Sequence, residues 1–488
     1  MNVAGVDSST QSTKVLIKNA QTGELIREGS ASHQSGVDKN GNPIFGTETD
    51  PQIWLQALHL AIKNAGGLED VAAISIAGQQ HGMVLIDENK DVVRPALLWN
   101  DVRSASQAKK LNFEIGGDNE IAKRTGSVLL AAFTASKVRW VAENESENIR
   151  KTHAIALPHD WLSWKINAND NSLESLATDA SDASGTGYFN PLTNSYDYDL
   201  LNLSVNKIKD AKEITLPKIT PKNQPIGISN LVTGKEVLIA PGAGDNAGAA
   251  LGLNLQPGDA VISLGTSGTV FVVSDKPTND SRGLVAGFSD TTGRYLPLVC
   301  TLNAARIFDQ ACKLLDVNFA ELSDLALKAL PGSGGLTLLP YFEGERTPNR
   351  PNAKGILSGM NLSNSTRENI ARAMIEGVIC GMVDAVLALK ECGIQPKRYL
   401  LIGGAASNPA VQQITASLLG GEIYLPTPGQ YVAEGAARQA AWILNSTPEP
   451  PIWNNTPVAV VNSDISTKVA SEVIERYREL RDSTESWN

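Results

Sequence analysis

Residues 3–17, VAGVDSSTQSTKVLI, form an apolar run, a turn of serines and threonines, and a second apolar run. Residues 261–273, VISLGTSGTVFVV, repeat this pattern about half a chain length later. Each stretch predicts a β-hairpin with a small polar turn. Such turns are common in unrelated hairpins, but their recurrence in both halves indicates a duplicated architecture in which the two turns face one ligand.

Strand-like and helix-like stretches alternate along almost the whole chain, which favours an α/β fold. The clearest helix begins at Asp50-Pro51, where aspartate can cap the helix and proline fits its first turn. A second unit begins near Gly234, so we expect two domains, 1–233 and 234–488. The other expected elements are strands at 24–29, 71–76, 96–99, 237–240 and 399–402, and helices at 304–315, 368–390 and 467–480.

Composition restricts the class of protein. The chain has 488 residues, 42% of them hydrophobic, and a formal net charge of −10. The hydrophobic share is that of a folded globular protein, and the negative charge argues against nucleic acid as a partner. No secretory signal and no uncharged apolar run of about 18 residues is visible, so we expect a cytoplasmic protein without a membrane partner. The four cysteines are far apart and predict buried free thiols.

Asp7 lies in the first polar turn, at the end of an apolar strand. The backbone N–H groups of such a turn can bind phosphate oxygens. A carboxylate would repel a bare phosphate, so the turn makes chemical sense if Mg²⁺ lies between the two. An ion pair between Asp7 and Lys14 would explain the same residues equally well.

A second aspartate, Asp245, lies in residues 237–252, VLIAPGAGDNAGAALG. The glycines match a dinucleotide-binding fingerprint, but Asp245 would crowd a pyrophosphate and no acidic residue ends a second strand about twenty positions on, so we reject a nicotinamide enzyme. Small neighbouring residues leave room for a substrate, whose hydroxyl the carboxylate could deprotonate as a general base. The simpler alternative is that Asp245 only caps the helix that follows.

Two polar segments follow strands in the first half, GQQHGM at residues 78–83 and LLWNDVR at residues 97–103. Their amide, imidazole, indole and carboxylate groups suit a polyhydroxylated ligand, because its hydroxyls need donors and acceptors while a ring covers its C–H groups. A hydrogen-bonded structural histidine and an ordinary solvated loop are the alternatives. The candidate residues are Gln80, His81, Trp99, Asn100, Asp101 and Arg103.

Gly403 and Gly404 follow a strand and precede a helix in residues 400–408, LLIGGAASN. Without side chains they would let a ribose or a flat ring lie against the backbone, although close packing of strand and helix would also require glycine. The chain has no GxxxxGK[ST] motif, so any nucleotide site is not of the P-loop type.

In this order, DSSTQSTK, GQQHG, LLWNDVR, GDNAGAA, SLGTSG, PYFEGERTP and IGGAASN resemble the FGGY family of carbohydrate kinases over residues 7–442. The resemblance implies two ribonuclease-H-like (actin-like ATPase) domains with a catalytic cleft between them, where ATP and sugar meet. It also implies Mg²⁺ and is consistent with a homodimer. GQQHGM, LLWNDVR and EGAARQAAW are most similar to members that phosphorylate D-xylulose.

The resemblance also assigns roles to single residues. Asp245 matches the catalytic base, and Asp7 matches the aspartate that acts with Mg²⁺, through water. Three groups of residues match binding sites: Gln80, His81, Trp99, Asp101 and Asn246 for the sugar; Thr10, Gly265, Thr266 and Ser267 for phosphate; and Gly403, Gly404, Ala405 and Asn408 for adenosine. The chain departs from the usual pattern at Ser9 and Ala405, where glycine is usual, and at Gln80, which is methionine in many members.

We therefore expect ATP-dependent phosphorylation of the terminal hydroxyl of D-xylulose. One alternative is a kinase of the same family that acts on ribulose, gluconate or glycerol. The other is a non-catalytic actin- or Hsp70-like nucleotide switch, which shares the duplicated hairpins but gives no reason for Gln80, His81, Trp99 and Asp101.

Overall fold

The computed structural model describes residues 1–34, 36–38, 40–44, 46–168, 172–453 and 458–487. The chain forms two compact units. The first unit consists of Met1–Leu255, Asp275–Leu296 and Gly429–Asn455. The second consists of Gln256–Ser274, Pro297–Pro428 and Thr456–Asn488. A division at Gly234 therefore separates residues that the structure keeps together, because strands beyond that point belong to the first sheet.

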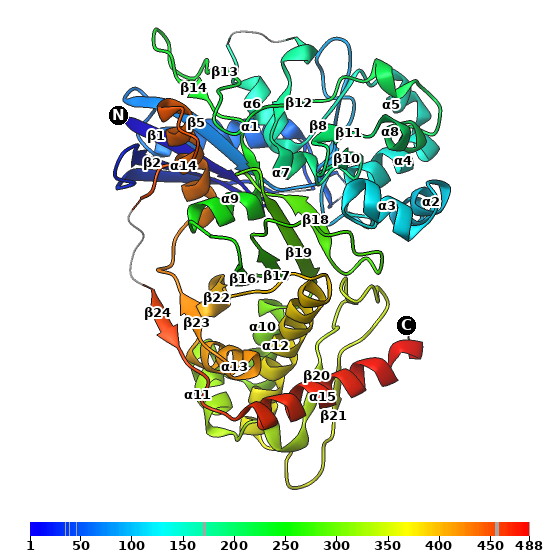
Figure 1. Ribbon diagram of the computed structural model, residues 1–488, viewed down its shortest axis with the longest axis vertical. Coiled ribbons are helices and arrows are strands. Elements are labelled where there is room, and N and C mark those ends of the chain that lie inside the picture. Colours follow the sequence, from blue (N-terminus) through cyan, green and yellow to red (C-terminus); the bar gives the residue numbers. More distant parts are fainter. Residues whose placement is uncertain (35, 39, 45, 169–171, 454–457, 488) are drawn as a thin grey trace. The chain divides into compact units, whose positions relative to one another are not determined.

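The sheet of the first unit has the strand order β13-β14-β5-β1-β2-β3, and β15 also pairs with β5 (Figure 1). The pairs β1–β2 and β2–β3 are antiparallel, whereas β5 is parallel to β1, β14 and β15. The predicted hairpin and the strands at 24–29 and 71–76 are confirmed. Their bounds are β1 (Asn2–Ser8), β2 (Ser12–Asn19), β3 (Leu25–Ser32), β5 (Val71–Gly78), β13 (Gly227–Ile228), β14 (Leu238–Ile239) and β15 (Ala243–Gly244).

Within the second unit the strand order is β19-β17-β16-β22-β23-β24. The pairs β16–β17 and β17–β19 are antiparallel, and β22 is parallel to both β16 and β23. In each unit, three antiparallel strands thus form a meander, and the first strand of the meander is followed in the sheet by two strands parallel to it. This shared topology confirms the duplication expected from the two hairpins. The bounds are β16 (Asp259–Leu264), β17 (Gly268–Val272), β19 (Tyr295–Thr301), β22 (Arg398–Ile402), β23 (Ile423–Leu425) and β24 (Ala459–Val461).

Helices and short strands complete both units. In the first unit these are α1 (Pro51–Asn64), α2 (Ala105–Glu114), α3 (Asp118–Thr125), α4 (Thr134–Asn144), α5 (Ser146–Lys151), α6 (Pro158–Lys165), α7 (Ala180–Ala183), α8 (Tyr198–Ser204), α9 (Asp245–Gly252) and α14 (Tyr431–Asn445), with β4 (Glu48–Thr49), β6 (Val84–Ile86), β7 (Ala96–Leu97), β8 (Ala154–Ala156), β9 (Ala177–Thr178), β10 (Phe189–Asn190), β11 (Ser195–Tyr196), β12 (Lys218–Ile219) and β18 (Ala286–Ser289). In the second they are α10 (Ala305–Leu315), α11 (Phe319–Lys328), α12 (Arg367–Glu391), α13 (Pro409–Leu419), α15 (Thr467–Ser483), β20 (Thr337–Leu339) and β21 (Ile356–Ser358).

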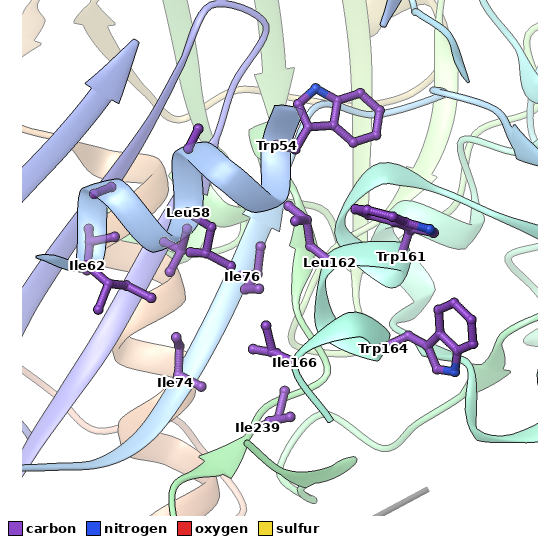
Figure 2. Packing of buried hydrophobic residues seen from close by; sticks show 14 of the residues in the cluster. Trp54, Leu58, Ile62, Ile74, Ile76, Trp161, Leu162, Trp164, Ile166 and Ile239 are labelled. Atoms are coloured by element: carbon purple, nitrogen blue, oxygen red, sulfur yellow. The ribbon is translucent and has the colours of Figure 1, made fainter. Parts of the chain in front are cut away.

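Figure 2 shows an apolar cluster of the first unit. α1 begins as predicted, with the Asp50 carboxylate accepting a hydrogen bond from the backbone of Gln52 and proline in the first turn. Trp54, Leu58 and Ile62 recur every fourth residue and therefore lie on one face of the helix. Full burial of side chains of this size contributes about 1.5–3 kcal/mol each. The cluster fixes α1 and α6 against β5 and so determines where β5 ends.

α14 packs directly on α9 and on β1, although it comes from residues 431–445 near the end of the chain. A Cβ atom on Gly435 would lie only 1.8 Å from the carbonyl oxygen of Gly248, so two helix backbones meet here without side chains between them. This contact explains the sequence GAARQAA. Residues 431–445, which the sequence analysis assigned to the second domain, lie in the first compact unit.

Two further predictions can be compared with the structure. All four cysteines, which lie within the described residues, are free thiols, but only Cys380 is buried. No helix among the described residues is both long and apolar enough to cross a membrane.

Candidate active site

The register of β5 brings the two predicted catalytic aspartates to one edge of the first sheet. Asp7 of β1 and Ala243 of β15 both pair with Ala77 of β5, one from each side. Because neighbouring strands are about 4.8 Å apart, the backbones at Asp7 and Ala243 are about 10 Å apart. Asp245 follows two residues later, where β15 ends and α9 begins. The carboxyl ends of parallel strands meet at this edge, and ligands of α/β proteins commonly bind there.

The Asp7 side chain is buried, with 7% of its surface exposed. Burial raises the pKa of this carboxyl group to about 7; Lys14 lowers it and the negative charge of Asp245 raises it further. Lys14 lies directly opposite Asp7 on β2, but its ammonium group donates to Gln430 Oε1 at 2.7 Å. Among the described residues no ion pair joins Lys14 to Asp7. The structure therefore does not support the ion-pair interpretation of Asp7.

Asp245 is the first residue of α9, and Gly244 occupies the cap position. Its Oδ1 accepts hydrogen bonds from the backbone N–H of Asn246 at 2.8 Å and from the Asn246 side-chain amide at 2.9 Å. The side chain keeps some exposed surface, yet burial raises the pKa of Asp245 to about 6 while the bonds from Asn246 lower it. The helix-cap interpretation is thus not realised, and Asn246, a predicted sugar contact, orients the carboxylate of Asp245.

Gln80 follows β5 and lies against the backbone that carries Asp245. Its Nε2 donates to the carbonyl oxygen of Ser181 at 2.8 Å, and a Cβ atom on Gly244 would be 3.3 Å from the same nitrogen. Gln80 therefore has 8% of its surface exposed and a fixed side chain. The methionine usual in the family could not make this hydrogen bond.

His81 has a left-handed backbone conformation with φ of 69°, which is uncommon for a residue with a side chain. Its carbonyl oxygen accepts hydrogen bonds from Thr134 Oγ1 at 3.1 Å and from Lys137 Nζ at 3.2 Å. Its ring Nδ1 donates to the carbonyl oxygen of Gly185 at 2.6 Å, and the ring centroid is 4.9 Å from that of Phe133. Non-glycine residues held in such a conformation are concentrated at functional sites.

The remaining candidates of the first unit, Trp99 and Asp101, also lie near this edge but differ in their hydrogen-bond partners. Trp99 Nε1 donates to Thr10 Oγ1 at 3.1 Å, so the indole is tied to the first polar turn. Asp101 is 2% exposed and accepts from Thr47 and from the guanidinium group of Arg103. Both Asp101 oxygens thus already have partners within the protein.

The predicted nucleotide residues lie in the second unit. The turn at Gly265, Thr266 and Ser267 joins β16 to β17, and Thr266 is exposed. The carbonyl oxygen of Gly265 accepts from the backbone of Ala305, where α10 begins. The second small polar turn is therefore both accessible and anchored.

Gly403 and Gly404 are exposed where β22 ends. Gly403 has φ of 96°, and a Cβ atom there would be 2.5 Å from the carbonyl oxygen of Leu264, so only glycine fits. Ala405 is buried, and Asn408 caps α13 by accepting from the backbone of Ala410 and Val411. The structure thus uses the Asn408 side chain to begin a helix. Ser9 adopts no left-handed conformation, so serine fits where glycine is usual.

Sequence reasoning missed two buried polar side chains beside Asp245. His159 of α6 hydrogen-bonds Asp182 of α7, and Gln439 of α14 holds both backbone polar groups of Gly242. The only signal for His159 was the sequence PHDW, and Gln439 could not be found because its partner is 197 residues away.

Two sheets of one topology, each with a small polar hairpin, and two carboxyl groups with raised pKa values at one sheet edge indicate a phosphotransferase of the ribonuclease-H-like (actin-like ATPase) class. Phosphoryl transfer needs donors for phosphate oxygens and a base for the acceptor hydroxyl.

Comparisons with known proteins agree with this class. Residues 2–252 match the N-terminal domain of the FGGY family of carbohydrate kinases, and residues 260–444 match its C-terminal domain. The chain belongs to the FGGY family of carbohydrate kinases.

Individual relatives are similar over nearly the whole chain. The xylulose kinase of Streptomyces rubiginosus is 40% identical over 450 residues, which cover 91% of this chain and 88% of that protein. The xylulose kinase of Escherichia coli K12 is 32% identical over 455 residues, or 90% of each chain. The crystal structure of xylulose kinase from Bifidobacterium adolescentis covers 99% of both chains at 43% identity with a TM-score of 0.87.

Proposed function

We propose that this carbohydrate kinase transfers the γ-phosphoryl group of ATP to the terminal hydroxyl of D-xylulose and yields D-xylulose 5-phosphate and ADP. The observation that carries the proposal is the shared edge of the first sheet, where Asp7 lies near the end of β1 and Gln80 and Asp245 follow the neighbouring strands β5 and β15. The identity to xylulose kinases over 90% or more of the chain supports this choice of sugar.

In this proposal Asp245 is the general base. Its carboxylate is oriented by Asn246 and has a pKa of about 6, so it is ionised at neutral pH and can accept the proton of the hydroxyl that attacks the γ-phosphorus. A pKa near the working pH is the best compromise between being ionised and being a strong enough base. Gln80 and His81, which follow β5, would bind the ketose beside it.

Mg²⁺ fits the surroundings of Asp7. This buried carboxyl group has a pKa raised to about 7, and the Lys14 ammonium group on the opposite strand position donates to Gln430 instead of pairing with it. Carboxylate, hydroxyl and water oxygens are ligands that Mg²⁺ accepts. Asp7 would hold the ion, directly or through water, and the bound ion would offset charge on the ATP phosphates. The turns at Thr10 and at residues 265–267 would donate hydrogen bonds to phosphate oxygens, and Gly403 and Gly404 would face adenosine.

A panel of acceptors tests the sugar. The purified chain, ATP and Mg²⁺ are assayed for ADP release with D-xylulose, D-ribulose, gluconate and glycerol, and we expect the highest kcat/KM with D-xylulose. A higher value with another acceptor would reassign the substrate within the family. ATP binding without turnover on any acceptor would favour the nucleotide-switch alternative.

A substitution tests the base. Asp245→Ala should lower kcat by about 10²–10⁴-fold, because that is the usual contribution of a general base, with little change in sugar binding. Asp118→Ala is the matched control, since Asp118 is also the first residue of a helix after a glycine cap but is exposed and far from the sheet edge in sequence. Near-normal turnover of the Asp245 variant would refute the assignment.

A further inference from the structure

The most deeply buried polar cluster of the first unit lies behind the candidate base. It contains His159 at the start of α6, its neighbour Asp160, and Asp179 and Asp182 of the α7 region. His159 and Asp182 are 0% exposed, and Asp160 is 1% exposed. None of these residues was assigned a role by the sequence, and none reaches the solvent from which a ligand would come.

Both ring nitrogens of His159 face oxygen acceptors. Nδ1 is 2.5 Å from Asp182 Oδ2, and Nε2 is 3.2 Å from the carbonyl oxygen of Pro241 and 3.2 Å from Asp160 Oδ1. A neutral imidazole can donate from only one nitrogen, whereas an imidazolium donates to the oxygens at both, so we infer a proton on each. The carboxylates of Asp160, Asp179 and Asp182 hold the pKa of His159 near 10 against the opposing effect of burial.

Hydrogen bonds account for the contacts of both ring nitrogens. Each nitrogen is at hydrogen-bond distance from an oxygen. The cluster is therefore held together by protons, with a cationic ring among carboxylates.

On one side, the cluster contacts the backbone segment that precedes the candidate base. The Pro241 carbonyl bonded to Nε2 precedes Gly242, whose φ of 85° places it in the left-handed region. A Cβ atom on Gly242 would be 2.3 Å from His159 Cδ2, so the ring lies flat against this glycine. Gln439 Oε1 accepts from the Gly242 N–H at 3.0 Å and its Nε2 donates to the Gly242 carbonyl at 2.8 Å. The backbone is thus clamped three residues before Asp245.

On the other side, the cluster is connected to Gln80, a candidate residue for sugar binding. Asp182 lies on α7, next to Ser181. The Ser181 carbonyl oxygen accepts from Gln80 Nε2, and the Ser181 hydroxyl accepts from the backbone N–H of Gly244 at 3.1 Å. α7 therefore touches both Gln80 and the residue before Asp245, and His159 joins α7 to Pro241.

We propose that protonated His159 is a positioning residue, which sets Asp245 relative to Gln80 by bridging Asp182 on α7 and the carbonyl oxygen of Pro241. His159 makes no contact with substrate in this scheme. The inference rests on the proposed function only in so far as Asp245 is the base; the charge on the ring and the bridge do not depend on it.

The first experiment measures the charge directly. The chain has five histidines, so selective ¹⁵N-histidine labelling gives few signals, and His159→Gln identifies those of His159. We expect both ring N–H signals of His159 in the wild-type chain to persist, without titration, up to about pH 9. Loss of one of them near pH 6.5, the usual range of histidine, would overturn the bridge whatever the enzyme phosphorylates.

The second experiment measures positioning. His159→Gln keeps a donor but removes the charge and one of the two bonds; it should lower kcat on the order of 10²-fold, the usual result of displacing a catalytic group by about 1 Å, and leave the KM for ATP within about twofold. His159→Lys, which restores a buried cation with several donors, should recover most of the lost kcat. His153→Gln is the matched control, because His153 is a partly exposed histidine of the same unit.

A merely structural role would lower the melting temperature of both variants without the separation of kcat from KM and without rescue by lysine, and that result would overturn the proposal. If His159→Gln does not fold, the spectrum of His159→Lys identifies the His159 signals of the wild-type chain, and these signals still decide. If the wild-type chain phosphorylates none of the sugars while both His159 signals persist, the proposed function fails and the charged bridge stands.

Discussion

Replacing the candidate base by its uncharged isostere should make the ligand-free protein more stable while it destroys activity. Burial raises the pKa of Asp245 from 3.8 to about 6, which means that the folded protein disfavours the ionised carboxylate. Each pKa unit corresponds to about 1.4 kcal/mol, so the ionised side chain costs the folded state about 3 kcal/mol at pH 8. Asp245→Asn removes this cost and keeps an oxygen that can accept from Asn246.

Part of the gain is offset at the helix terminus. A negative charge in the first turn of α9 is stabilising by about 0.3–1 kcal/mol, and asparagine gives this up. The net increase in the free energy of unfolding is therefore about 2–3 kcal/mol at pH 8. For a unit of about 300 residues this corresponds to a rise of roughly 3–5 °C in melting temperature.

The direction of the pKa shift determines how the stability difference between Asp245→Asn and wild type changes with pH. Because the folded pKa lies above the unfolded one, the cost of the carboxylate is complete above about pH 7 and disappears as the pH falls toward 4. The advantage of Asp245→Asn should thus be largest at pH 8 and about half as large at pH 5. Differential scanning calorimetry without Mg²⁺ or nucleotide measures both values.

The exposed aspartate at the equivalent helix position supplies the control. Asp118 is the first residue of α3 and follows Gly117. Asp118→Asn loses only the interaction with the helix terminus, so its melting temperature should fall slightly at both pH values. A variant at Asp245 that is no more stable than wild type at pH 8, or whose gain is the same at pH 5, would refute the reasoning from burial.

Two further predictions follow from the same contacts. The value of kcat/KM should fall as the pH drops below about 6–7, because Asp245 and Asp7 must both be ionised and have pKa values of about 6 and about 7. A pH–rate profile measures this fall, and a value of kcat/KM unchanged down to pH 5 would contradict the prediction. In α12, Gly377→Ala should lower the free energy of unfolding by about 1–3 kcal/mol, because its Cβ would lie 2.5 Å from the carbonyl oxygen of Leu338. Gly381→Ala, one turn further on, meets nothing closer than 3.5 Å and should leave the free energy of unfolding unchanged or raise it by up to about 1 kcal/mol. Chemical denaturation of the two variants measures both values, and equal effects would contradict the packing argument.

The elements that the sequence predicts well are local ones. The helix at residues 51–64 has its capping aspartate and its proline within two adjacent residues, and the hairpin at residues 3–17 has its turn between its own strands. The position of α14 depends instead on Gly435 meeting Gly248, and nothing in either segment identifies the other. The pairing of β14 and β15 could not be predicted for the same reason, since their partner β5 lies more than 150 residues earlier in the chain.

The same distinction holds for the site. Small polar turns and strand ends indicate where ligands bind, so Asp7, Gln80 and Asp245 could be named as candidates, but their common edge could not be predicted, because Asp245 was expected in the second domain. The partners of the side chains could not be predicted. Asp101 is bound by Arg103 and Thr47, and Asn408 accepts hydrogen bonds from the first turn of α13. These residues have the right chemical groups for ligand binding, but the fold has used those groups for its own hydrogen bonds.

The first unit contains two groups of acidic side chains, and they differ in their partners. Burial raises the pKa of Asp160, Asp179 and Asp182, but Asp182 and Asp160 face the two ring nitrogens of the fully buried His159, so this group has a cationic partner within the protein. Asp7 and Asp245 have no such cation: Lys14 is turned to Gln430, and both carboxyl groups have raised pKa values. A carboxylate that is costly in the free protein becomes favourable when positive charge or a hydroxyl donor arrives, which is what a metal–nucleotide complex and a sugar supply. This difference is why we propose Asp7 and Asp245 as the reacting pair and the cluster around His159 as its support.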